Sequence, residues 1–268
     1  MEIMKLKIPF RKERKTVSVL RLSGMISNGA RGQINDQTFA PVIERAFEKG
    51  NPSAVALVIN SPGGSPVQSS LIAARIRRLA EEKNIPVLAF VEDVAASGGY
   101  WIAVAADEIF VDANSIVGSI GVISAGFGLH DLIARYGVER RVYTAGTSKS
   151  TLDPFQPEKT EDVKRLKSML EEVHKTFKLH VSNRRGAKLS QNEDLFTGAF
   201  WTGQKAIELG LVDQLGHLDV VLKARFGDKV RVKTYGPKKS WASRFGARVL
   251  GDAALLAEEK IAFARFGL

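Results

Sequence analysis

Residues 54–64 read AVALVINSPGG, and residues 86–99 read PVLAFVEDVAASGG. Each stretch opens with an apolar run of strand length, reaches a pair of glycines and leads into a segment with helical apolar spacing. Strands without polar alternation are typical of parallel sheets that are covered on both faces. The two stretches therefore predict an α/β fold with a mostly parallel sheet, in which each strand passes through a glycine turn into a helix.

The flanking sequence continues this alternation. Residues 16–22 are rich in β-branched and aliphatic side chains, and residues 36–49 have helical spacing, with Gly50 placed to end the helix. Residues 160–184 form a long charged segment that we also expect to be helical. The second glycine turn is expected to comprise residues 95–99, with its helix starting at Tyr100.

The composition limits the available chemistry. The chain has 268 residues, enough for one large domain or two small ones, and 44% of them are hydrophobic. It has no cysteine, which excludes disulfides, cysteine metal sites and a thiol nucleophile. We expect no metal ion and no other cofactor. Two of its four histidines, His174 and His180, lie in the charged helical segment, where we expect them to be solvated.

The net charge of +10 is concentrated near the two ends of the chain. Residues 1–16 carry six lysines and arginines against two glutamates, and residues 221–250 carry nine against one aspartate. Without interleaved aromatic residues, this pattern predicts solvated faces and no nucleic acid partner. No stretch supplies a membrane span, and the first residues lack the apolar core of a secretory signal. We therefore expect a cytoplasmic protein with at most weak peripheral contact at an anionic membrane surface.

The two glycine turns are the places where we expect chemistry. In a parallel sheet both turns leave the carboxyl ends of their strands at one edge, so Gly64 and Ser97 are expected to converge there. A serine flanked by small residues on such a turn resembles a nucleophile elbow, although it also suits an ordinary turn or helix cap. No histidine lies in a motif that would supply a base, and a Ser-Lys pair remains as a solution if the lysine is desolvated.

Four motifs, in this order, resemble the signal peptide peptidase A (SppA) family of serine peptidases, family S49. They are Asn60-Ser-Pro-Gly-Gly64, Ala96-Ser-Gly-Gly-Tyr100, Gly118-Ser-Ile-Gly121, and Ala145-Gly-Thr-Ser-Lys-Ser150 followed by Asp153-Pro-Phe155. The resemblance covers residues 17–235 and implies a ClpP/crotonase-like superhelix of ββα units.

The resemblance also implies roles for individual residues. Ser97 would be the nucleophile and Lys149 the general base. The backbone N–H groups of Gly64 and Gly98 would form the oxyanion hole, and Ser119 would orient the lysine. In this interpretation the chemistry requires no metal.

Family membership further implies a homo-oligomer in which one subunit's lysine reaches its neighbour's serine. The substrates would be extended or unfolded peptides, such as hydrophobic signal peptide remnants. The expected organisation is a basic arm (residues 1–16), a peptidase domain (17–235) and a basic amphipathic C-terminal helix (236–268). Two alternatives stay open at this point: a crotonase-type acyl-CoA enzyme, and a catalytically silent scaffold that binds membranes or proteins.

Overall fold

The computed structural model describes residues 14–28, 33–191, 193–237, 257 and 259–268. Most of the expected basic arm, residues 1–16, lies outside the described residues, as does much of the expected C-terminal helix, residues 236–268. The strands are β1 (Thr16–Ser23), β2 (Ala54–Ser61), β3 (Val87–Ala96), β4 (Glu108–Val111), β5 (Ile116–Gly118), β6 (Phe200–Thr202), β7 (Gln214–Leu215) and β8 (Arg231–Tyr235). The α-helices are α1 (Asp36–Glu48), α2 (Pro66–Lys83), α3 (Gly98–Ala103), α4 (His130–Arg135), α5 (Thr160–Arg185), α6 (Gly203–Glu208) and α7 (Leu218–Phe226), and short 3-10 helices span Gly186–Lys188 and Glu193–Phe196.

The strands form one sheet in the order β6-β5-β3-β2-β1-β8, and β4 pairs with both β3 and β7. Strands β5 and β6 pair antiparallel, and the other named pairs are parallel. The central strand β2 is buried along almost its whole length, as its continuous apolar sequence predicts. The mostly parallel α/β architecture expected from the sequence is thus confirmed.

Strand β3 is longer than its apolar run, and this corrects the expected turn at residues 95–99. Residues 88–91 pair with β4, and residues 94–96 pair with β5. The exposed Glu92 and Asp93 lie where the partner strand changes. The second pairing carries the strand up to Ala96, so that only Ser97 separates it from α3, which begins at Gly98.

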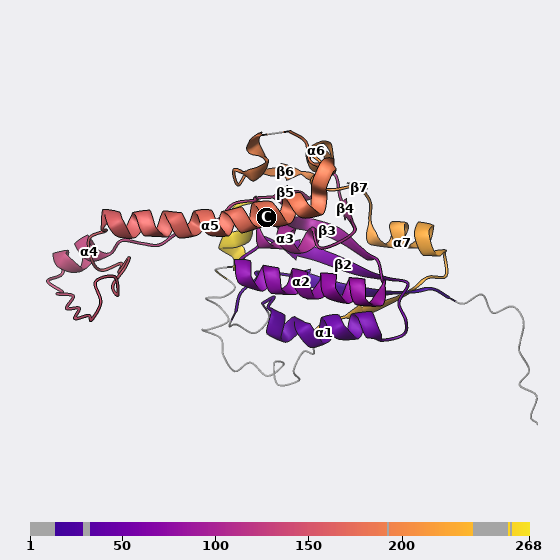
Figure 1. The fold of residues 1–268 in the computed structure, drawn as a ribbon, viewed down its shortest axis with the longest axis horizontal. Coiled ribbons are helices and arrows are strands. Elements are labelled where there is room, and N and C mark those ends of the chain that lie inside the picture. The colour runs from indigo at the N-terminus through magenta and orange to yellow at the C-terminus, as the bar shows by residue number, and fades with distance from the viewer. Residues whose placement is uncertain (1–13, 29–32, 192, 238–256, 258) are drawn as a thin grey trace, which may run out of the picture.

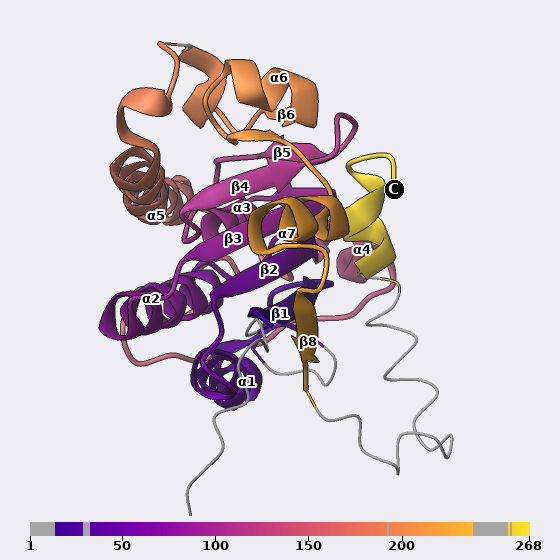
Figure 2. The same ribbon diagram turned by 90° about the vertical axis from the view of Figure 1, so that its right-hand side faces the viewer.

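Helices cover both faces of the sheet (Figure 2). The larger core joins one face to α1, α2, α3 and α5 and includes Leu57, Ile72 and Phe177. A smaller core on the other face packs Phe90 and Phe110 against α7, and the centres of these two rings are 4.9 Å apart. Both faces are therefore buried, which explains the absence of polar alternation in the central strands.

Helix α3, which follows Ser97, is fixed by two large aromatic side chains. The hydroxyl of Tyr100 donates a hydrogen bond to the carbonyl oxygen of Leu211 at 2.6 Å. Burial raises the pKa of Tyr100, which keeps its phenol neutral. The ring of Trp101 stacks on Phe177 of α5, with 4.7 Å between the ring centres. These contacts prevent α3 from moving independently of α5.

Residues 121–176, which include α4 and the first part of α5, project as an arm from the rest of the described chain, which we call the body (Figure 1). None of the side chains in the arm is buried, whereas Phe177, Val181 and Arg185 anchor the rest of α5 in the body. Residues 160–176 correspond to about 25 Å of helix at 1.5 Å per residue. Helix α4 and the loop after it lie at the distal end of this arm (Figure 1).

An ion pair anchors the end of α5. Arg185 Nη1 lies 2.9 Å from Asp213 Oδ2, and Lys188 Nζ lies 2.7 Å from Asp213 Oδ1. The N–H of Ile109 in β4 donates to the same carboxylate at 2.8 Å. Burial alone would raise the pKa of Asp213, but the hydrogen bonds from Arg185, Lys188 and Ile109 outweigh it and lower that pKa. The carboxylate therefore joins α5 to the sheet in its charged form.

No helix in residues 14–28, 33–191, 193–237, 257 and 259–268 is long and apolar enough to cross a membrane.

Replacing Asp213 with asparagine is expected to lower the free energy of unfolding by about 3 kcal/mol near neutral pH, because Arg185 loses its buried counter-charge. Since the folded state lowers the pKa of Asp213, the carboxylate stabilises the fold above its unfolded pKa, and this contribution is lost as pH falls through the folded pKa. The difference in the free energy of unfolding between the variant and the wild type should therefore become smaller in acid. Urea unfolding at about pH 7 and about pH 3 measures it.

The matched control is Asp219→Asn, which alters an exposed aspartate in the first turn of α7. Its effect is expected to be below about 0.5 kcal/mol. Equal losses of stability in the two variants would contradict the anchoring role of Asp213.

Candidate active site

Ser97 lies between β3 and α3 in a strained backbone conformation. Its φ is 49° and its ψ is −119°, a combination that costs a non-glycine residue about 1–3 kcal/mol. Its N–H donates to the carbonyl of Gly118 at 2.8 Å, and its own carbonyl accepts from the N–H of Trp101 at 2.9 Å. Ser97 is partly exposed between the buried residues 94–96 and 98–106. The fold therefore presents this serine at an accessible point of an otherwise buried segment.

The N–H groups of Gly64 and Gly98 lie close together beside Ser97. A Cβ atom added to Gly98 would lie 3.4 Å from the nitrogen of Gly64, and one added to Gly63 would lie 2.8 Å from both Gly98 N and Ser97 Cβ. Neither N–H has an acceptor in the described part of the chain. Two unpaired N–H donors next to a serine are what an oxyanion hole requires. The two glycine turns thus meet at one sheet edge, as the parallel topology predicts.

The loop before α2 is built around Ile26. The N–H of Ile26 donates to the carbonyl of Gly63 at 2.9 Å, and the N–H of Ser65 donates to the carbonyl of Ile26 at 2.7 Å. The hydroxyl of Ser61 accepts from the N–H of Gly63 at 3.2 Å. Gly64 has a φ of 140°, and a side chain there would collide with the carbonyl oxygen of Ile26. Only glycine fits this position.

Ser119 lies next to Ser97 across the sheet. Gly118 of β5 pairs with Ala96 of β3, so Ser119 and Ser97 are the next residues on neighbouring strands. Ser119 also has a positive φ of 51°, and its N–H donates to the carbonyl of Ala199 at 2.7 Å. The structure therefore brings Ser97, Ser119 and the two glycine N–H groups together.

Lys149 is not part of this cluster. It is exposed and belongs to the loop between α4 and α5. This loop lies at the distal end of the arm (Figure 1). No hydrogen bond or ion pair joins its side chain to another described residue, Ser97 included. Within one chain the nucleophile and its expected base are therefore apart.

The loop that carries Lys149 has a defined shape even though it lies outside the body. Asp153 accepts a hydrogen bond from the N–H of Phe155 at 3.0 Å and lies 3.2 Å from Arg140 Nη2. The Arg140 guanidinium also lies over the Phe155 ring, 5.5 Å from its centre. The N–H of Phe155 chiefly lowers the pKa of Asp153; burial opposes this shift and Arg140 reinforces it. These contacts connect Arg140, near the start of the loop, with Asp153 and Phe155, near its end.

The expectation that His174 and His180 are solvated is wrong. Each donates a hydrogen bond from Nε2 at 3.0 Å, His174 to the carbonyl of Ile120 and His180 to that of Trp101. The His180 ring stacks on Trp101, and burial chiefly lowers the pKa of His180, with Arg184 adding to the shift and the hydrogen bond to Trp101 opposing it. Helix α5 is thus tied to both segments that carry the candidate serines. The partners of these two hydrogen bonds are 54 and 79 positions apart in the chain, and local sequence patterns do not indicate contacts at such separations.

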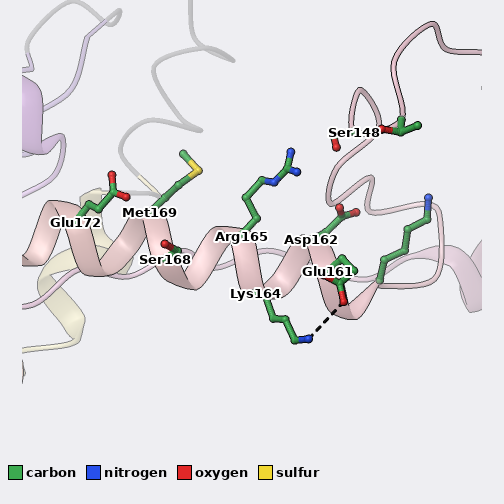
Figure 3. Close-up of a pocket in the computed structure, with 10 residues that line it drawn as sticks. Ser148, Glu161, Asp162, Lys164, Arg165, Ser168, Met169 and Glu172 are labelled. Carbon is green, nitrogen blue, oxygen red and sulfur yellow. Dashed lines mark hydrogen bonds and ion pairs between the residues drawn. The ribbon is translucent and has the colours of Figure 1, made fainter.

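An open hollow lies between the first turns of α5 and the loop at residues 147–148 (Figure 3). Its lining mixes acidic and basic side chains, among them Asp162 and Arg165. Lys164 Nζ lies 3.4 Å from Glu161 Oε1 in an exposed pair. Interspersed exposed charges of both signs are typical of a solvated surface. The hollow belongs to the arm, and the candidate catalytic serine belongs to the body.

The family model of Peptidase family S49 matches residues 79–231. This range begins in the last turns of α2, contains Ser97, Ser119 and Lys149, and ends at the first residue of β8. The chain belongs to peptidase family S49, as its four motifs indicate.

This chain matches only part of the length of two curated relatives. It is 50% identical to the Na(+)/H(+) antiporter NhaA of Brucella abortus in an alignment 278 positions long, which covers 97% of this chain and 38% of that protein. It is 35% identical to the probable protease SohB of Haemophilus influenzae over 194 residues, which is 72% of this chain and 54% of that protein. Each name therefore describes a protein longer than the region matched.

Among solved structures, the 1510-N membrane-bound stomatin-specific protease superposes with a TM-score of 0.52 at 16% sequence identity. The match covers 84% of this chain and 99% of that chain. At this identity the likeness concerns the fold alone. It confirms the ClpP/crotonase-like arrangement expected from the resemblance.

Replacing Gly64 with alanine is expected to lower the free energy of unfolding by about 2–3 kcal/mol, because the added methyl group meets the Ile26 carbonyl and the backbone has a positive φ. Gly126→Ala is the matched control, since no atom lies within 4 Å of a Cβ atom added there. Thermal unfolding of both variants measures the difference. Equal midpoint temperatures of unfolding for the two variants would show that the loop before α2 accepts a side chain at Gly64 and that its conformation does not depend on glycine.

Proposed function

We propose that this protein is a serine endopeptidase that uses Ser97 as nucleophile and Lys149 as general base. The observation that carries the proposal is the strained, accessible Ser97 beside the unpaired N–H groups of Gly64 and Gly98. A backbone that holds a hydroxyl and two donors in one place, at a cost in strain, is typical of an acyl-transfer site. Family S49 membership supports the same reaction class.

The reaction follows from these groups. The neutral amine of Lys149 accepts the Ser97 hydroxyl proton as the oxygen attacks a peptide carbonyl, and the resulting oxyanion accepts hydrogen bonds from Gly64 and Gly98. The lysine then gives its proton to the leaving amine, which leaves an acyl ester on Ser97. Water, deprotonated by the same lysine, hydrolyses that ester. In this proposal Ser119 accepts or donates a hydrogen bond that orients the lysine amine.

The base is supplied by a neighbouring copy of the chain in this proposal. Lys149 lies on the exposed arm, and the arm also exposes large apolar side chains: Ile123, Phe127, Leu132, Tyr136, Val138 and Tyr143. Phe127 is 85% exposed and Tyr143 is 91% exposed. Contiguous exposed apolar side chains mark interaction surfaces. Packing the arm on a second subunit would bury these side chains and desolvate Lys149, which a lysine base requires.

The proposed substrates are extended or unfolded hydrophobic peptides, such as remnants of signal peptides. An accessible serine beside two unpaired backbone N–H groups can receive the carbonyl of a chain whose backbone is exposed, as in an extended or unfolded peptide. We place the protein in the cytoplasm, with weak peripheral contact at an anionic membrane surface through its basic ends. The residues that would make most of that contact, 1–13 and 238–256, lie outside the described residues.

Ser97→Ala and Lys149→Ala are each expected to reduce cleavage of an unfolded protein by at least about a thousandfold, because the nucleophile and its base act as one unit. Lys149→Arg should be equally inactive, since an arginine stays protonated. Lys159→Ala, which alters an exposed lysine of the same arm, should retain wild-type activity. A fluorophosphonate probe should label Ser97 in the wild-type protein. Strong cleavage by Ser97→Ala would refute the dyad, and a wild-type protein that neither labels nor cleaves would favour the silent scaffold.

Mixing the two inactive variants tests whether the dyad is shared between chains. If Lys149 acts on the neighbour's Ser97, equal amounts of Ser97→Ala and Lys149→Ala chains, dissociated and reassembled together, should recover roughly a quarter of wild-type activity. A dyad within one chain would recover none. The number of active sites titrated by the fluorophosphonate probe provides an independent count.

A further inference from the structure

The turn that carries Ser119 is tight and unfavourable by itself. Ser119 has a φ of 51°, in the left-handed region that non-glycine residues rarely adopt. The N–H of Gly121 donates to the carbonyl of Ser119 at 2.9 Å, which closes a three-residue turn around Ile120. A Cβ atom added to Gly121 would lie 3.0 Å from the Cα atom of Gly198, so the turn also passes close to another segment. Contacts from the rest of the fold therefore have to hold this turn.

His174 of α5 supplies one of these contacts. Its Nε2 donates to the carbonyl oxygen of Ile120 at 3.0 Å, and because a carbonyl only accepts, the proton is on Nε2. Ile120 is fully buried, and His174 is half-buried. In the described part of the chain, no other hydrogen bond and no ion pair joins α5 to residues 116–129. His174 therefore joins the two places where the arm leaves the body.

Helix α5 is a firm support for this contact. Phe177 follows His174 by three residues, so both side chains lie on one face of the helix, and Phe177 is buried against Trp101. Further along the helix, Arg184 Nε donates to the carbonyl of Val104 at 2.8 Å. These contacts hold α5 in the body without His174. Loss of the His174 hydrogen bond would therefore release the turn at residues 119–121 and leave the helix in place.

A displaced turn would move Ser119, which orients the lysine amine in the proposed mechanism. Ser119 is the residue next to Ile120 in the chain, and it lies beside Ser97 across the sheet. The donor of His174 is engaged by the Ile120 carbonyl, so His174 acts on the site through the backbone and not on the reacting atoms.

We propose that His174 is a positioning residue of the peptidase site: its hydrogen bond to the Ile120 carbonyl holds the turn that presents the Ser119 hydroxyl to the catalytic lysine. This inference rests on the proposed function, because it deepens the same site. It assigns to α5 a role in the chemistry as well as in carrying the arm.

A double-mutant cycle tests whether His174 acts through Ser119. His174→Leu removes the donor and is expected to lower kcat for cleavage of an unfolded protein by at least about tenfold, with KM within about twofold, because the base is misplaced while peptide binding is kept. Ser119→Ala should lower kcat at least as much. The double variant should match Ser119→Ala within about twofold, since residues that act as a unit are not additive. A further tenfold loss in the double variant would overturn the proposal.

A conservative variant and an exposed neighbour provide the controls. His174→Gln should recover at least about half of the wild-type kcat, because its amide Nε2 can donate to the same carbonyl. Lys175→Leu, which alters the exposed next residue of α5, should retain wild-type activity. Equal kcat values for His174→Leu and His174→Gln would overturn the proposal, and this comparison decides it if Ser119→Ala leaves no measurable cleavage.

Amide hydrogen exchange tests the same contact without turnover. In His174→Leu, the N–H groups of Ser119 and Gly121 should exchange at least about fivefold faster than in the wild type, because their turn opens more often. The N–H groups of residues 177–185 should exchange at the wild-type rate, since α5 stays anchored. Unchanged exchange at Ser119 and Gly121, or equal acceleration along α5, would overturn the proposal.

The outcome is separable from that of the proposed function. A wild-type protein that does not cleave would remove the peptidase and with it the catalytic consequence of His174, while the exchange pattern would still show whether His174 holds the turn. Cleavage that depends on Ser97 and does not respond to His174→Leu would keep the peptidase and remove the inference.

Discussion

The turn at Ser97 imposes the main constraint on this structure. A serine with a φ of 49° is unfavourable by itself, so the surrounding fold has to hold it. The pairing of β3 with β5 supplies the Gly118 carbonyl that accepts its N–H, and the buried Tyr100 fixes the helix that follows. The glycines on both turns are needed because the two loops approach so closely that a Cβ atom at Gly63 would meet Ser97. The strain is thus balanced by contacts from β5, from α3 and from the loop before α2.

The body and the arm differ in how firmly they are held. The body buries both faces of its sheet, and Asp213 and Arg185 fix the end of α5 to it. The arm buries none of its side chains, although Asp153 and Arg140 give its distal loop a defined form. In the proposed mechanism this division has a use: the nucleophile and oxyanion donors are preorganised in one chain, and the base becomes effective only when a second chain covers the arm.

Residues 259–268 add to the cover of the sheet beside the candidate site. Phe266 packs on Val94 and Ala96, and its ring meets that of Phe200 edge to face. This packing joins residues 259–268 to β3 and β6 and buries apolar side chains that would otherwise be exposed to water next to Ser97.

Sequence alone determined the class of fold and predicted that the two glycine turns meet at one sheet edge. Continuous apolar strands require cover on both faces, and the carboxyl ends of parallel strands share an edge, so Gly64 and Ser97 could be brought together without coordinates. Only the tertiary structure decided the length of β3, the contacts of His174 and His180, and the separation of Lys149 from Ser97. These features depend on which distant segments meet. Strand β3 continues because β5 is there to pair with it, and His180 is partly buried because Trp101, 79 residues away in the chain, lies beside it in space. Local periodicity records which face of a segment is apolar, but it does not record the partner that covers that face.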